Sequence, residues 1–100
     1  LGIRTAWHGP GDLSPVGHAA NIHLDVCCPN FGVQEWSGIS DRLREVFPGS
    51  PEIEDGYAYP NDKPGLGIDI DEEKAAKYPI SNELPKWTLA RLPDGTSVRP

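Results

Sequence analysis

Three residues have side chains that could bind a polar ligand: His8, Asp12 and Glu35. His8 and Asp12 flank a Gly-Pro-Gly segment, whereas Glu35 lies much further along the chain. An imidazole and two carboxylates can form strong hydrogen bonds to the hydroxyl groups of a ligand. The same nitrogen and oxygen donors would suit zinc or manganese as a three-ligand set. A site that binds hydroxyl groups and a three-ligand metal site are therefore both candidates.

Each of these residues also has a purely structural alternative. Asp12 could cap the helix expected after it, and His8 could simply end a strand. Glu35 could be an exposed acid at a strand end, since acidic side chains are mostly exposed. The glycines on either side of Pro10 favour a binding loop, because they allow the backbone to approach a ligand closely.

The elements around these residues follow from local patterns. Residues 1–7 alternate as a strand does, and residues 31–36 form a second apolar run of strand type. Between them, Ser14 is a suitable N-cap, Pro15 fits the first helical position, and Pro29 ends the helix. The apolar residues expected on the buried face of this helix are Val16, Ala19, Ala20, Leu24 and Cys27.

Two strands joined by a helix predict a βαβ unit, whose strands run parallel and whose crossover is right-handed. Because parallel strands end on the same side of a sheet, His8, Asp12 and Glu35 are expected on one rim. Ligands bind at that rim in α/β folds. The sequence therefore predicts an α/β fold with one polar site at the strand ends.

The second half of the chain has fewer regular elements. Short helices are expected over residues 40–47 and 71–78, separated by a Pro- and Gly-rich extended segment with a turn at Asp55-Gly56. A strand near residues 87–92 and a turn at residues 93–96 are also expected. Two parallel strands alone would leave sheet edges and a helix face open, so the rest of the sheet is expected outside this chain.

Composition excludes several classes of partner. The net charge of −6 and the pI near 4.8 leave no basic patch for nucleic acid or for anionic membranes. No transmembrane span or signal peptide is recognisable, and the absence of methionine indicates a piece of something longer. The adjacent Cys27 and Cys28 are interpreted as reduced, packed thiols of a cytoplasmic protein. His18 and His23 lack the spacing of a helical metal pair and are interpreted as structural or solvated.

Three separated motifs then carry a family resemblance: RTAWHGPGD at residues 4–12, NFGVQE at residues 30–35 and YPNDKPGLGID at residues 59–69. They resemble the C-terminal quarter of the mannonate dehydratase group of the enolase superfamily, which includes proteins described as starvation-sensing. The closing residues 91–96 are also similar to the tail of that group. The motifs stand in the family order and together cover essentially the whole chain.

The resemblance implies the C-terminal part of a TIM-type (β/α) barrel with a capping domain. Residues 1–47 would supply the last two barrel strands and the helix between them, and residues 48–100 an extension that packs toward the cap. By the same resemblance, His8, Asp12 and Glu35 contact the substrate. The Mg²⁺ ligands and the catalytic residues of the family would lie upstream, outside this chain. The family also implies a homo-oligomer.

The function implied is that of a Mg²⁺-dependent acid-sugar dehydratase, a carbon–oxygen lyase, with D-mannonate as the first expected substrate and a 2-keto-3-deoxy sugar acid as the product. The fragment by itself is expected to be inactive. The alternative is a non-catalytic or regulatory relative, which would lack one of the three upstream Mg²⁺ carboxylates. The family's C-terminal tryptophan has no counterpart in the closing Ser-Val-Arg-Pro, so the sugar preference stays open.

Overall fold

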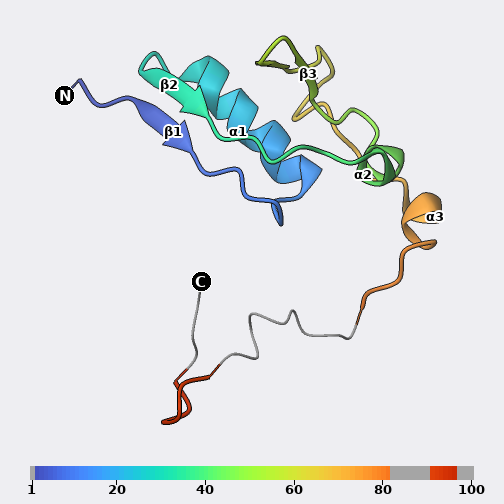
Figure 1. Cartoon of the computed structure of the whole chain (residues 1–100). Coiled ribbons are helices and arrows are strands. Elements are labelled where there is room, and N and C mark those ends of the chain that lie inside the picture. Colours follow the sequence, from blue (N-terminus) through green and yellow to red (C-terminus); the bar gives the residue numbers. More distant parts are fainter. Residues whose placement is uncertain (1, 82–90, 97–100) are drawn as a thin grey trace.

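The first part of the chain folds as a βαβ unit in the computed structural model, which describes residues 2–81 and 91–96 (Figure 1). Its elements are β1 (Thr5–Trp7), α1 (Pro15–Cys27) and β2 (Phe31–Gln34). β1 and β2 pair in parallel, with Trp7 opposite Gln34. The predicted α/β unit with parallel strands is therefore confirmed, although the described residues form no closed barrel.

The ends of α1 are set by the residues that the sequence indicated. The Ser14 hydroxyl accepts a hydrogen bond of 3.2 Å from the Gly17 amide, and Pro15 occupies the first turn, where a missing N–H costs nothing. Because Ser14 caps the helix, the capping alternative for Asp12 is wrong. Asp12 lies in the turn just before the cap.

Both strands are shorter than predicted. β1 begins at Thr5 rather than at the first residue, and β2 ends at Gln34, so Glu35 follows the strand. Strand pairing does not extend to Ile3. The Ile3 carbonyl accepts a hydrogen bond of 3.0 Å from the Asn30 side chain rather than from a strand amide. Alternation of side chains continues beyond the ladder, which is why the pattern overestimated the strand.

The buried face of α1 differs from the one predicted. The residues that it buries, spaced three and four apart, are Pro15, His18, Ala19 and Ile22. Ala19 and Ile22 face the segment around Pro51 and Pro60. The expected core positions Leu24 and Cys27 are exposed, because no described segment covers that end of the helix. Cys27 and Cys28 are both free, but Cys27 is not packed.

The second half adds two short helices and a hairpin. Its elements are α2 (Asp41–Val46), β3 (Glu52–Glu54), β4 (Tyr57–Tyr59) and α3 (Glu72–Ala75). β3 and β4 pair antiparallel around Asp55 and Gly56, whose φ angles of 49° and 80° are those of a type I′ turn. The turn was predicted from the sequence, whereas the two strands were not.

α2 and α3 lie side by side (Figure 1). The Asp71 amide donates to the Val46 carbonyl at 2.8 Å, and the Lys77 ammonium lies 2.8 Å from a Glu45 carboxylate oxygen. α3 is shorter than the helix predicted over residues 71–78. The turn predicted at residues 93–96 is present, whereas most of the strand predicted over residues 87–92 falls outside the described residues.

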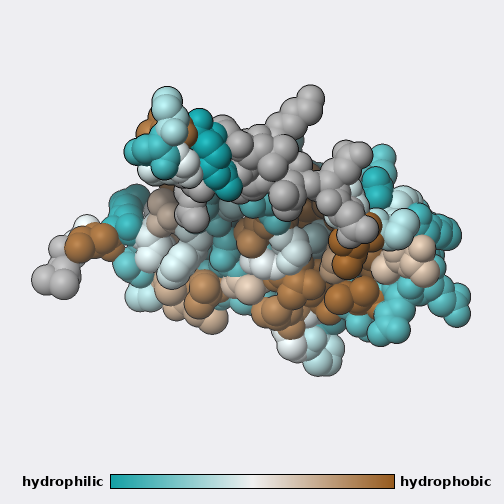
Figure 2. Space-filling view, turned by 90° about the horizontal axis from the view of Figure 1, so that it is seen from below, coloured by the Kyte–Doolittle hydropathy of each residue, from teal (hydrophilic) through white to brown (hydrophobic). Residues whose placement is uncertain are grey.

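Few apolar side chains are buried. Within residues 2–81 and 91–96, the buried apolar residues are Ala19, Ile22 and Val46. Figure 2 shows apolar side chains gathered in brown patches on one face, and large exposed apolar residues include Ile3, Val26, Val33 and Tyr57. No helix in the described part of the chain is long and apolar enough to cross a membrane. We expect a core this small to contribute little stability by itself.

We therefore expect the isolated 100-residue chain to lack a sharp thermal transition. Its sheet edges and apolar faces would be open to water, which favours broad unfolding or aggregation. Circular dichroism and calorimetry on the purified chain test this expectation. A single cooperative transition, with equal calorimetric and van't Hoff enthalpies, would instead show a self-sufficient domain.

Candidate ligand-binding site

The structure brings His8 and Glu35 together at the ends of the two parallel strands. His8 directly follows β1 and Glu35 directly follows β2. The His8 Nδ1 atom lies 2.5 Å from the Glu35 Oε2 atom. Both side chains are open to solvent, with 76% and 57% of their surface exposed. The predicted convergence of these two residues is confirmed, and their role as ligand contacts stays a prediction.

The loop backbone completes this pair. The amide of buried Gly9 donates a hydrogen bond of 2.9 Å to the same Glu35 oxygen that His8 contacts. The Gly9 amide, and after it the His8 side chain, hold the pKa of the Glu35 carboxyl below its usual range. Glu35 is therefore a carboxylate at neutral pH. It accepts hydrogen bonds there, which suits the recognition of hydroxyl groups.

The two loops meet closely enough to exclude a side chain at Gly9. A Cβ atom there would collide with the Glu35 carbonyl oxygen and would lie 3.2 Å from the Gln34 Nε2 atom. The Gln34 amide donates to the Trp7 carbonyl at 3.2 Å and to the Glu35 carbonyl at 2.7 Å. These bonds tie the ends of β1 and β2 together, so the position of His8 depends on that of Glu35.

Asp12 lies on the same loop but stands apart from the pair. It is exposed, and no hydrogen bond or ion pair joins it to His8 or Glu35, although all three residues are described. The described residues contain no group of three His, Cys, Asp or Glu side chains that could hold a metal ion. The three-ligand metal set considered from the sequence is therefore not formed.

Two residues of α1 that sequence reasoning did not assign to the site lie beneath it. The Asn21 amide donates a hydrogen bond of 3.1 Å to the His8 carbonyl. His18, interpreted as structural or solvated from its spacing, is buried and lies near Ser37 in the loop after β2. The available sequence signal was the three-residue spacing of His18 and Asn21 on one helix, which places both near the same face.

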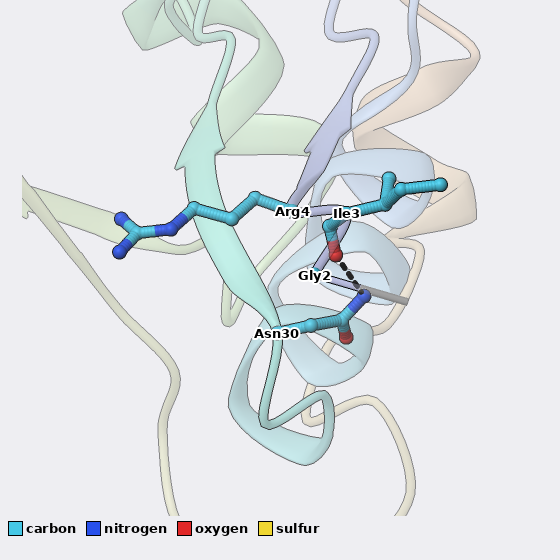
Figure 3. A pocket seen from close by; sticks show the side chains of 4 residues that line it. All are labelled: Gly2, Ile3, Arg4 and Asn30. Carbon is cyan, nitrogen blue, oxygen red and sulfur yellow. Dashed lines mark hydrogen bonds between the residues drawn. The ribbon is translucent and has the colours of Figure 1, made fainter.

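Two other hollows of the described surface do not include the pair, although the second one reaches Gln34 and Trp36 on either side of Glu35. One pocket is lined by Gly2, Ile3, Arg4 and Asn30, at the opposite end of β1 from His8 (Figure 3). In that view the Asn30 amide reaches the Ile3 carbonyl, and the Arg4 side chain extends away from both. A second groove runs between β2 and the β3–β4 hairpin, and its lining includes Phe31, Val33 and Tyr57. Neither hollow includes His8, Asp12 or Glu35.

A polar pair at the ends of parallel strands, with a helix beneath, is typical of ligand-binding α/β domains. Residues 1–74 match the family model described as Enolase C-terminal domain-like. The chain belongs to this family, which is part of the enolase superfamily.

Curated relatives of this chain are named as members of a dehydratase family. A D-galactonate dehydratase family member of Salmonella virchow (strain SL491) is 69% identical over 99% of this chain, and RspA, a member of the same family from Pantoea ananatis (strain LMG 20103), is 64% identical over the same share. This chain spans 24% of the length of each. It therefore spans about a quarter of the length of the relatives that it matches.

Solved structures resemble the chain as well. A crystal structure described as an enolase from Pantoea ananatis, with bound D-gluconate and Mg, has a TM-score of 0.83 and 64% identity, over 97% of this chain and 23% of that one. A mandelate racemase/muconate lactonizing enzyme from Jannaschia sp. has a TM-score of 0.70 and 30% identity, over 81% of this chain and 20% of that one. Both likenesses extend over most of the described fold.

Proposed function

We propose that this chain is the C-terminal part of a Mg²⁺-dependent acid-sugar dehydratase. Residues 1–47 would form the last βαβ unit of a TIM-type barrel, and residues 48–100 an extension that packs toward a capping domain. The family match, the 69% identity to a D-galactonate dehydratase family member and the likeness to a structure with D-gluconate and Mg support this proposal. A cytoplasmic homo-oligomer remains part of the proposal.

The observation that carries the proposal is the exposed His8–Glu35 pair at the strand ends. A polyhydroxy acid presents several hydroxyl groups that can donate hydrogen bonds. Because the Glu35 carboxylate can only accept, His8 donates to it through Nδ1, which leaves the His8 Nε2 atom and the second Glu35 oxygen to face the hydroxyl groups of the sugar. Asp12, on the same loop, is proposed to contact a further hydroxyl group. The proposed role of this chain in the reaction is thus to bind and orient the sugar. Orientation supplies a large share of rate enhancement.

In the proposed reaction, a base in the upstream part of the protein takes the proton from the carbon next to the carboxylate. The hydroxyl group of the following carbon receives a proton and leaves as water, and the resulting enol tautomerises to the 2-keto-3-deoxy acid. Mg²⁺, when bound, stabilises the negative charge that develops on the carboxylate when the first proton is taken. The described residues contain no three-ligand group for the ion, so its ligands are proposed to lie in the upstream part of the protein. His8, Asp12 and Glu35 then act on the sugar rather than on the metal.

The substrate is proposed to be a hexonic acid. D-mannonate is suggested by the motif resemblance alone, whereas one similar structure holds D-gluconate and relatives are named D-galactonate dehydratase family members. D-mannonate and D-gluconate differ only at the carbon that loses its proton, so both would give the same 2-keto-3-deoxy acid. Product identity therefore separates this pair from D-galactonate, and relative rates separate the two epimers.

The test is an assay of the full-length protein against a panel of acid sugars that includes these three. We expect at least one to be dehydrated in the presence of Mg²⁺, with the activity lost on chelation and restored when Mg²⁺ is added back. The 100-residue chain serves as the negative control. If the folded full-length protein turns over no sugar of the panel with Mg²⁺ present, the enzyme assignment is wrong and the non-catalytic relative takes its place.

A further inference from the structure

We propose that His18 is a positioning residue of this site: from α1 it holds the loop after β2, which carries Glu35, against the loop after β1, which carries His8. The inference rests on the proposed function and adds to it a residue that contacts neither His8 nor Glu35. It follows from a chain of contacts that joins three separate elements.

The first contacts run from the helix to both loops. His18 is 1% exposed, and its Nε2 atom lies 3.4 Å from the Ser37 hydroxyl oxygen. Ser37 in turn donates a hydrogen bond of 2.9 Å to the Pro10 carbonyl. Pro10 lies in the His8 loop, and Ser37 lies two residues after Glu35. One hydroxyl group therefore connects the two loops, and His18 supports that hydroxyl group from below.

The direction of these bonds fixes the tautomer of His18. The single Ser37 hydroxyl proton is used on the Pro10 carbonyl, so Ser37 can only accept from His18. His18 must then carry its proton on Nε2. Burial lowers the pKa of His18, which keeps the ring neutral in this tautomer at neutral pH. Its Nδ1 atom is buried and has no hydrogen-bond partner within the described part of the chain.

His18 also fixes the residue between Glu35 and Ser37. Its ring lies against Trp36, with 4.3 Å between ring centroids and a tilt of 47°. Two successive residues after Glu35 thus contact one helical side chain. A shift of His18 would move the backbone on which Glu35 stands.

A second residue of the helix holds the other loop. Asn21, three positions beyond His18, donates its hydrogen bond of 3.1 Å to the His8 carbonyl. Positions three apart on a helix lie on neighbouring parts of one face. α1 therefore supports the Glu35 loop through His18 and the His8 loop through Asn21, and the rigid helix sets the distance between them.

Within the described residues, stability gives no reason for a histidine at this position. A buried nitrogen without a partner costs free energy, and an apolar side chain of similar size would avoid that cost. Functional sites often keep residues that are unfavourable for stability. The positioning role therefore predicts that leucine at position 18 is tolerated by the fold and harmful to the site.

The experiment compares full-length variants His18→Leu, His18→Gln and Ser37→Ala, with His23→Leu as a control on the same helix. On the fastest acid sugar, we expect His18→Leu to lower kcat about 10-fold or more, since misplacing a site by about 1 Å can cost 100-fold. The melting temperature should stay equal or rise. His18→Gln, whose amide can still donate to Ser37, should recover most of the loss. The effects of His18→Leu and Ser37→Ala on kcat should not add in the double variant, because both remove the same contact.

A crystal structure of the His18→Leu variant gives a readout that does not depend on activity. We expect the fold to be retained and the contact between His8 Nδ1 and Glu35 Oε2 to be opened. An unchanged contact together with kcat within twofold of the wild type would overturn the proposal. A parallel loss of melting temperature and activity, without recovery in His18→Gln, would overturn it too. An opened contact in a protein that turns over no sugar would leave the positioning role standing and reject only the proposed reaction.

Discussion

Replacement of His8 by alanine in the full-length protein is expected to lower kcat/KM for the best acid sugar by about 10- to 100-fold. The imidazole lies 2.5 Å from the Glu35 carboxylate and is 76% exposed, so it can reach a bound ligand. Loss of a side chain that orients the sugar can have an effect of this size, because a misplacement of about 1 Å can cost 100-fold. Steady-state kinetics on the substrate found in the panel measures the change.

The matched control for this prediction is His23→Ala. His23 is a half-buried histidine of α1 that lies near Asn61 and Leu66 rather than at the rim. Its replacement should leave kcat/KM close to the wild-type value. A kcat/KM of His8→Ala within twofold of the wild type, in a folded protein, would remove His8 from the site.

Replacement of Gly9 by alanine is expected to have a still larger effect, about 100-fold or more on kcat/KM. The added Cβ would collide with the Glu35 carbonyl, and a backbone atom at the end of β2 cannot move aside as a flexible side chain can. The two loops would separate, and the hydrogen bond from the Gly9 amide to Glu35 would be lost. Displacement of a site by about 1 Å can cost 100-fold. Overpacking of this kind also lowers the free energy of unfolding by about 1–3 kcal/mol.

Gly11→Ala is the control for backbone crowding. Nothing lies within 4 Å of a Cβ at Gly11, and its φ angle is not in the left-handed region. Its free energy of unfolding should stay within about 0.5 kcal/mol of the wild type, as for most surface changes. Equal unfolding free energies for the Gly9 and Gly11 variants, measured by denaturant titration, would show that the two loops do not depend on close contact at Gly9.

The parts of this structure that were predictable from sequence depend on local rules. Ser14 and Pro15 mark a helix start by hydrogen bonding and by a fixed φ angle, whatever lies around them. The parallel βαβ order then places His8 and Glu35 on one rim, because the crossover leaves no other arrangement. The Asp55-Gly56 turn is another local signal, since both residues adopt positive φ angles readily.

The remaining features depend on contacts that a local pattern does not contain. The buried face of α1 includes Ile22 and excludes Leu24, because the face is chosen by the segments that pack on the helix. The strands of the β3–β4 hairpin are short and mostly exposed, so no alternation of buried and polar positions indicated them. The contact of His18 with Ser37 joins residues of two elements, and spacing along one helix cannot show it.

His8 and Glu35 are proposed to bind the sugar together. The most direct measurement is a crystal structure of the full-length protein with Mg²⁺ and the acid sugar identified by the panel. We expect the His8 imidazole and the Glu35 carboxylate each to lie within about 3 Å of a sugar hydroxyl group. A sugar bound elsewhere in the protein, with His8 and Glu35 bonded only to each other as they are here, would show that this pair does not bind the substrate.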